Sequence, residues 1–203
     1  MNAAQSHTRY SKPDVVAAAM RVLAEQGLPG LSMRRIAEVL DVQVSALYWH
    51  FPNKQALLAA VSAQIVNTGN PDAAPDLAAI ATALRDRLLA HRDGAEIVSS
   101  SLALGLLELP SRASLVEAGR NLGLDEGAAA IAADTLVHFV IGYTFHEQQR
   151  MHAAVLGAAD ASVDLVPARV EERVDAFEAG LAMVVAGVRE ARQRMSHEST
   201  RTA

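Results

Sequence analysis

Two histidines and a glutamate at positions 146–152 are the first candidates for metal chemistry. His146 and Glu147 begin the pattern of a zinc-protease helix, but Arg150 stands where that pattern needs its second histidine. His152 follows His146 by six positions, about 240° around a helix and therefore off its face. The chain has no cysteine, and it contains neither a glycine-rich phosphate loop nor a Gly-x-Ser-x-Gly nucleophile motif. We therefore expect no metal site, no cofactor and no enzymatic activity.

A second group of residues, between positions 34 and 54, has side chains suited to DNA. Gln43, Ser45 and Tyr48 can form hydrogen bonds with base edges, and Val44 and Ala46 can contact thymine methyl groups. Arg34 and Lys54 can reach phosphates. Three aromatic residues, Tyr48, Trp49 and Phe51, fall within four consecutive positions. Neighbours on a helix lie about 100° apart, so one face cannot bury all three and at least one is expected to be exposed. An exposed aromatic cluster usually has a partner, although these residues could instead be core aromatics.

Capping residues and turns divide the first part of the chain into short helices. Ser11, Ser32 and Asn53 can cap helices, and residues 41–43 form a tight turn. From these signals, helices are predicted from about Pro13 to Gly27, from Ser32 to Leu40, from Val44 to His50 and from Asn53 to Gly69. The second and third helices are predicted to form a helix-turn-helix. In this motif the third helix enters the major groove, and Leu47 is expected to point inward and hold that helix against the first two.

The rest of the chain is also predicted to be helical. Helices are expected from Leu77 to Asp93, in short pieces from Ala95 to Gly123, from Glu126 to about Leu156 and from Ala168 to about Met195. A hinge is predicted over residues 70–76 and a loop over residues 157–167. The last helix carries an a/d stripe that favours packing along another helix, formed by Val170, Val174, Phe177, Leu181, Val184 and Val188. The predicted fold class is all-α, with a head over residues 1–55, a connecting fourth helix over about 54–69 and a body over 70–203.

Charge and hydropathy bear on partners and location. The net charge is -5, but residues 1–68 hold six basic and four acidic side chains, so the head is mildly basic and the remainder acidic. Local charge decides phosphate contacts, so an acidic body does not exclude DNA binding. The amino terminus is polar, and the most apolar stretch, residues 135–145, is too short for a membrane span of about 20 residues. We expect a cytoplasmic protein with no membrane partner.

Two runs in the head carry a more specific signal. Residues 31–37 (L-S-M-R-R-I-A) and, after an L-D-V turn, residues 47–54 (L-Y-W-H-F-P-N-K) resemble the DNA-binding head of the TetR family of repressors. The resemblance implies that the DNA-facing positions are Arg34, Gln43, Val44, Ser45, Ala46, Tyr48, Trp49, His50 and Lys54. Among them, residues 43–46 would contact bases, whereas Tyr48, His50 and Lys54 would mostly hold phosphates.

The body resembles the ligand domain of the family's tetracycline sensors at residues 92–95 and 138–148. In those sensors a histidine binds the magnesium of Mg-tetracycline and a glutamate holds the metal's water; the matching positions here are Val98 and His146. Because Val98 offers no metal ligand, we expect an effector other than Mg-tetracycline. An apolar or weakly polar organic molecule would suit the predicted effector-binding residues, which could also be core residues only: Val61, Leu84, Val98, Leu102, Leu106 and His138.

The same resemblance implies a homodimer. In this family two C-terminal helices of each subunit form a four-helix bundle, so the a/d stripe would be the dimer interface; the alternative is a seam within one chain. The chain is thus predicted to be a ligand-responsive repressor that binds double-stranded DNA and releases a near-palindromic operator when a small-molecule effector binds. The alternatives are an activator or co-repressor-dependent regulator on the same fold, a helical adaptor that binds no operator and, more remotely, a helical enzyme.

Overall fold

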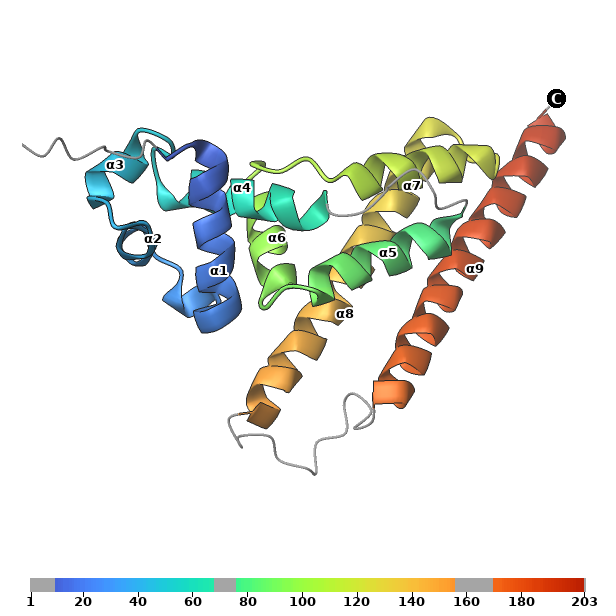
Figure 1. Ribbon diagram of the computed structural model, residues 1–203. Helices are drawn as coiled ribbons and strands as arrows, with labels where there is room; N and C mark the ends of the chain where they lie inside the picture. The colour runs from blue at the N-terminus through green and yellow to red at the C-terminus, as the bar shows by residue number, and fades with distance from the viewer. Residues whose placement is uncertain (1–9, 68–75, 156–169, 203) are drawn as a thin grey trace, which may run out of the picture.

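The computed structural model describes residues 10–67, 76–155 and 170–202. Within these residues the backbone forms helices and no strand, which confirms the all-α prediction. The helices are α1 (Lys12–Gly30), α2 (Met33–Leu40), α3 (Val44–Tyr48), α4 (Lys54–Val66), α5 (Leu77–Leu89), α6 (Gly94–Ala103), α7 (Pro110–Asn121), α8 (Glu126–Val155) and α9 (Val170–Thr202). Helices α1 to α3 lie at one end of the molecule, α4 joins them to the rest, and α5 to α9 form the body (Figure 1).

The head helices begin at the capping residues that the sequence indicates. Ser11 and Asp14 form a reciprocal capping box on α1, and the hydrogen bonds from Ser11 lower the pKa of the Asp14 carboxyl. The side chains of Ser32 and Asn53 accept hydrogen bonds from backbone N–H groups of the first turns of α2 and α4. Gly27 breaks the helical geometry as predicted, with φ of 69°, but one further turn to Gly30 follows it.

Several body helices differ in extent from their predicted bounds. Helix α5 ends at Leu89, before the predicted Asp93, because the side-chain amide of Gln148 on α8 donates hydrogen bonds to the carbonyl oxygens of Leu88 and His91. The stretch from 95 to 123 resolves into α6 and α7, and α9 continues past the predicted end to Thr202. The predicted loop over 157–167 and, apart from Asp76, the predicted hinge over 70–76 lie outside the described residues.

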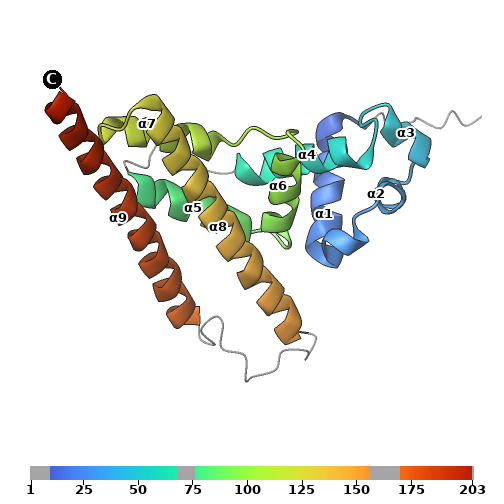
Figure 2. The ribbon, with the colours of Figure 1, turned by 180° about the vertical axis from the view of Figure 1, so that it is seen from behind.

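The long helices α8 and α9 run in opposite directions, as the front and rear views both show (Figures 1 and 2). Helix α8 packs against α5, α6 and α7, and one hydrophobic core continues from the head into the body. By length and composition alone, residues 126–154 of α8 pass the test for a helix that could cross a membrane, a test that a buried core helix also passes. In this fold, however, its apolar side forms the centre of the body.

A buried ion pair joins α5 to α8 beneath α9. The Arg85 guanidinium donates hydrogen bonds to both carboxylate oxygens of Glu147 at 2.9 Å, and both side chains are buried. The guanidinium carbon also lies 4.6 Å from the centre of the Phe177 ring of α9. The ring of Phe177 packs in turn on Phe139 and Tyr143 of α8. One ion pair and its aromatic neighbours therefore hold three helices together.

Replacing Glu147 by alanine should strongly destabilise the protein, because the buried Arg85 guanidinium would lose its counter-charge. We expect the free energy of unfolding to fall by about 3–5 kcal/mol, as measured by urea denaturation at one fixed protein concentration. The control is Glu190→Ala, which breaks an exposed ion pair with Arg194 and should leave stability nearly unchanged. Equal effects of the two substitutions would contradict this role of the buried pair.

Candidate nucleic-acid interface and ligand cavity

Helix α3 is held against the head by its inward side chains. Asp41 adopts a left-handed conformation with φ of 53°, and its N–H bonds back to the end of α2, which makes the tight turn before α3. Leu47 and, just beyond the helix, Phe51 are buried in the core. Because these two residues anchor one side of a short helix, its opposite side must face solvent.

The exposed side of α3 carries the residues predicted to contact DNA. Tyr48 is 50% exposed and Trp49 is 88% exposed, whereas Phe51 is buried, so the expectation of an exposed aromatic is confirmed. The remaining predicted DNA-facing residues are exposed at Arg34, Gln43 and Ser45 and half-buried at Val44, Ala46, His50 and Lys54. All nine are therefore at least partly accessible to solvent, and their contacts with DNA stay a prediction.

An acidic side chain shares the basic part of this surface. Glu38 accepts hydrogen bonds from Arg34 at 3.3 Å and from Arg35 at 3.2 Å. All three side chains are solvent-exposed, and ion pairs of this kind contribute little to stability. Arg34 can therefore exchange Glu38 for a phosphate at small energetic cost.

A joint between the head and the body is formed around Asp93, which is buried although charged. Its carboxylate accepts a hydrogen bond of 2.6 Å from the Leu28 N–H at the end of α1 and lies 3.4 Å from Nδ1 of His152 on α8. At Gly27 a Cβ atom would stand 2.7 Å from the same carboxylate. Only glycine permits both this close approach and the local φ of 69°.

Side chains of the body hold the other half of the joint. The Gln148 side chain accepts a hydrogen bond from the Ala95 N–H and donates to the carbonyls of Leu88 and His91, so α8 is clamped to the turn between α5 and α6. Arg92 on that turn donates to the carbonyl of Glu25 in α1. The sequence contained no periodic signal for these contacts, because they join residues more than fifty positions apart.

Helices α4 and α6 are joined by two buried hydroxyl groups. The Oγ atoms of Ser62 and Ser101 lie 2.8 Å apart, and Ser62 donates to the carbonyl of Ile97 at 3.2 Å. Helix α4 begins beside the exposed face of α3, whereas α6 carries residues of the body cavity described next. These bonds therefore connect the two candidate sites through the interior.

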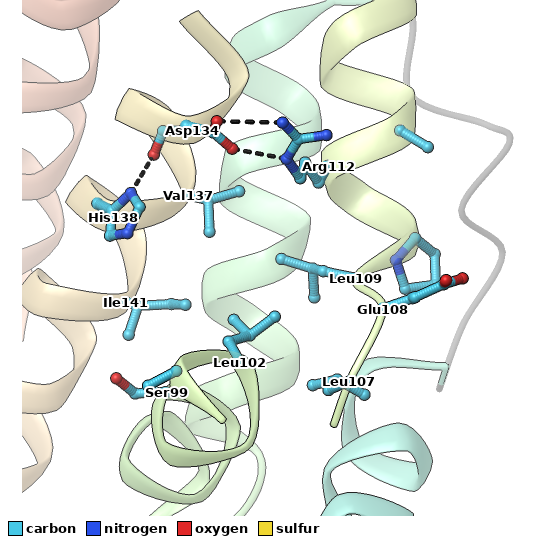
Figure 3. A pocket seen from close by; sticks show the side chains of 13 residues that line it. Ser99, Leu102, Leu107, Glu108, Leu109, Arg112, Asp134, Val137, His138 and Ile141 are labelled. Atoms are coloured by element: carbon cyan, nitrogen blue, oxygen red, sulfur yellow. Dashed lines mark hydrogen bonds and ion pairs between the residues drawn. The ribbon is translucent and has the colours of Figure 1, made fainter. Parts of the chain in front are cut away.

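A cavity of about 690 Å³ lies between α6, α7 and α8 (Figure 3). Its apolar lining consists of Leu102, Ala103, Leu107, Leu109, Pro110, Ala113, Val137 and Ile141, and its polar lining of Ser99, Glu108, Arg112, Asp134 and His138. Figure 3 shows Arg112, Asp134 and His138 gathered at one end of the cavity, with Ser99 and Leu107 at the other. Its volume is in the range of small-molecule sites.

The polar end of the cavity is ordered by an ion pair. Arg112 donates hydrogen bonds to both carboxylate oxygens of Asp134, at 2.6 and 3.1 Å. The hydrogen bond and the charge of Arg112 lower the pKa of Asp134 and, reciprocally, Asp134 raises the pKa of Arg112. The Nδ1 atom of His138 lies 2.6 Å from the Asp134 carbonyl oxygen, and because a carbonyl can only accept, Nδ1 is the donor.

The structure places only part of the predicted effector set at this cavity. Leu102 and His138 line it. Val61, Leu84 and Val98 do not: they are fully buried where α4, α5 and α6 pack together, and their part in effector binding stays a prediction. Leu106 is exposed on the segment between α6 and α7 and does not line the cavity either. The Arg112–Asp134 pair was missed because no periodicity relates α7 to α8.

The residues of the a/d stripe on α9, which are predicted to form the dimer interface, differ in burial. Phe177 and Leu181 are buried within the chain's own core and so offer a partner subunit little surface, while the interface itself stays a prediction. Val184 and Val188 are half-buried, and the side chains of Val170 and Val174 lie outside the described residues. The large apolar side chains exposed on these long helices include Ile131 of α8, at 70%, and Met183 of α9, at 75%.

The part of the chain that the structure describes contains no group of three or more His, Asp or Glu side chains placed to hold a metal ion. Glu147 is bound by Arg85, and His146 is exposed on α8. A helix-turn-helix with an exposed third helix, joined to a helical body with a cavity, defines a DNA-binding regulator of the helix-turn-helix class.

Comparison with known families agrees with this class. Residues 15–61 match the family described as "Bacterial regulatory proteins, tetR family", and residues 67–192 match "Tetracyclin repressor-like, C-terminal domain". The chain therefore belongs to the TetR family of transcriptional regulators. The proteins that it matches are regulators rather than enzymes.

Individual relatives cover nearly the whole chain. The tetracycline repressor protein class C of Escherichia coli is 30% identical over 210 residues, which covers 91% of this chain and 93% of that protein. The crystal structure of Mycobacterium smegmatis BioQ is 39% identical, with a TM-score of 0.77, and covers 89% of this chain and 98% of its own. The structure of BioQ with its natural double-stranded DNA operator is 37% identical, with a TM-score of 0.72 and the same coverages.

Replacing Gly27 by alanine should disturb the joint between head and body. A Cβ atom there meets both Asp93 and Arg92 within 3 Å, and the backbone conformation is one that nearly only glycine adopts. We expect the free energy of unfolding to fall by about 1–3 kcal/mol in urea denaturation. Gly127→Ala is the control, because a Cβ at that helical position meets nothing closer than 3.5 Å and should be neutral or slightly stabilising. A neutral Gly27→Ala would refute the close approach.

Proposed function

We propose that the protein is a homodimeric repressor that binds a near-palindromic operator through its head, residues 1–55, and releases it when an organic effector other than Mg-tetracycline enters the body cavity. The observation that carries the proposal is the exposed polar and aromatic face of α3, which Leu47 and Phe51 hold in place from behind. The similarity to BioQ, one structure of which contains its operator, supports DNA binding through the same fold.

In this proposal α3 is the recognition helix. Residues 43–46 contact base edges and thymine methyl groups, while Tyr48, His50 and Lys54 hold phosphates. Arg34 adds a phosphate contact from α2, and Trp49 packs against the DNA surface beside Tyr48. Two heads about 34–36 Å apart would then engage successive major grooves of a near-palindrome.

The signal from the cavity reaches the head through two routes of direct contact. Helix α6 contributes Leu102 to the cavity and is bonded to α4 through Ser101 and Ser62. The turn before α6 carries Asp93, which binds the Leu28 N–H of the head. An effector that favours a different position of α6 therefore favours a different position of the heads. A coupling of roughly 1–3 kcal/mol weakens operator binding about 5–150-fold.

Two features support an effector other than Mg-tetracycline. Val98, which matches the metal-binding histidine of the tetracycline sensors, is fully buried and apolar. The cavity instead has leucine-rich walls and one polar end, which suits an organic molecule that brings no metal.

For the homodimer, we propose an interface on the exposed faces of α8 and α9. Ile131 and Met183 are large apolar side chains with most of their surface in solvent. Exposed positions on the same two helices also include the small residues Gly142, Ala179 and Ala186, which would let two copies approach closely. Val184 and Val188 stand at the edge of this face.

Selection of bound fragments from the source genome by the purified protein, followed by sequencing, tests the function directly. We expect a near-palindromic sequence to be enriched, and its affinity to fall steeply as salt rises, because phosphate contacts release counterions. Effector addition that tightens DNA binding would instead indicate a co-repressor-dependent regulator or an activator. An absence of enrichment even at low salt would favour the adaptor.

Tyr48→Ala should weaken operator binding without disturbing the fold, because the side chain is half exposed on α3. We expect the dissociation constant to rise at least about tenfold, measured by fluorescence anisotropy of labelled operator. Leu104→Ala removes an equally exposed side chain from the body and should have no effect. Loss of helical circular dichroism in Tyr48→Ala would show that Tyr48 supports the core instead.

Met183→Glu should dissociate the proposed dimer, because it places a charge on an apolar interface. Analytical ultracentrifugation should show a dimer dissociation constant raised at least about tenfold, with the helical signal retained. The matched control is Leu104→Glu, at an exposed position of the body away from α8 and α9. A dimer equally stable in both variants would place the interface elsewhere.

A further inference from the structure

Glu38 is an acidic side chain on the surface that the proposed function assigns to DNA, and the inference drawn from it rests on that function. Its carboxylate is divided between two arginines of α2: Oε1 accepts from Nε of Arg34 at 3.3 Å, and Oε2 accepts from Nη1 of Arg35 at 3.2 Å. All three side chains are exposed, and exposed ion pairs add little to stability. A negative charge beside phosphates weakens DNA binding, so Glu38 matters more for DNA affinity than for folding.

The two arginines are held to different degrees. The Arg34 side chain is 86% exposed, and Glu38 is its partner in the described part of the chain. The Arg35 side chain is 41% exposed and is also tied to α1. With the Gln26 amide oriented so that its hydrogen bonds are satisfied, its oxygen accepts from Nε and Nη2 of Arg35 at 2.9 and 3.0 Å. Arg35 therefore stays in place, and Arg34 is the arginine that can leave for another anion.

The exchange of Arg34 from Glu38 to a phosphate has a small cost. The bond between Arg34 and Glu38, at 3.3 Å, is longer than the distance of about 2.7–2.9 Å that charged pairs prefer, so a phosphate can displace it. Once Arg34 has left, Arg35 still neutralises part of the Glu38 charge, and the carboxylate is not left without a partner. The ion pair is therefore a competitor that DNA must overcome wherever Arg34 meets a phosphate.

This competition does not depend on the base sequence of the DNA. Phosphates are alike along a duplex, and non-specific affinity comes essentially from phosphate contacts. Residues 1–68 hold six basic and four acidic side chains, a formal charge of +2 in which Glu38 cancels one of the basic charges. Loss of the Glu38 charge would therefore strengthen the attraction of the head for any duplex.

We propose that Glu38 limits the affinity of the head for DNA of any sequence, by holding Arg34 in an ion pair that a phosphate must replace. Phosphate contacts alone then hold the protein weakly, and the proposed base contacts of residues 43–46 decide where it remains. In this role Glu38 is a positioning residue, because it acts through Arg34 and contacts no base.

Glu38→Gln tests this role, because the amide keeps the shape of the side chain and removes its charge. Fluorescence anisotropy of the full chain with a labelled random-sequence duplex should show a dissociation constant lowered at least about twofold at low salt, with a steeper dependence of affinity on salt. The affinity for the operator should rise by a similar factor. Glu117→Gln is the matched control: it removes the same charge from an exposed pair with Arg120 on α7, and it should change neither quantity.

Arg34→Gln supplies the second variant. It should weaken the binding of both duplexes, and in its presence Glu38→Gln should have little further effect, because the arginine through which Glu38 acts is absent. An equal gain of affinity in both backgrounds would show that Glu38 acts as a general charge, and would overturn the proposal. A gain confined to the operator would assign Glu38 to base recognition, and would overturn it as well.

The wild-type protein separates this inference from the proposed function. Failure of the wild-type protein to bind either duplex at low salt would overturn both. Wild-type binding that Glu38→Gln leaves unchanged, with the helical circular dichroism retained, would overturn the role of Glu38 alone.

Discussion

The Asp93 carboxylate is the contact on which the arrangement of head and body depends. It is buried, it accepts the Leu28 N–H, and it lies beside His152 of α8, so one side chain joins the first helix of the head to the longest described helix before α9. Gly27 must lack a side chain for the approach to occur. A buried carboxylate without these partners would be costly, so the head cannot take another position without replacing them.

The body combines a rigid part with a hollow part. Arg85, Glu147 and Phe177 fix α5, α8 and α9 to one another through a buried ion pair and stacked rings. The cavity lies on the other side of α8, where α6, α7 and the segment between them form the wall. In the proposed switch, a ligand there moves α6 while the ion-paired part stays in place, and α6 is bonded to α4 through Ser101 and Ser62. The proposed switch needs only this difference in rigidity.

Apolar residues on the last helix serve two different surfaces. Phe177 and Leu181 close the core against α8, whereas Met183, two positions after Leu181, points into solvent. A heptad pattern shows that a helix has a continuous apolar side, but it does not show which neighbour covers that side. The body core therefore uses part of the stripe that the pattern assigned to a partner subunit, and the outward faces of α8 and α9 are left for association.

Local chemistry let the sequence determine the helices, their caps at Ser11, Ser32 and Asn53, and the inward and outward sides of α3, because each depends on residues a few positions apart. The head was also predictable because its motif is contiguous. The lining of the cavity was not predictable in this way. Val61, Leu84 and Val98 have the apolar character of pocket residues, yet helix packing buries them. Arg112 of α7 and Asp134 of α8 form an ion pair between two different helices. The joint at Asp93 was equally invisible, since its partners come from α1 and α8. Contacts between distant helices depend on how whole faces pack, and only the tertiary structure decides that.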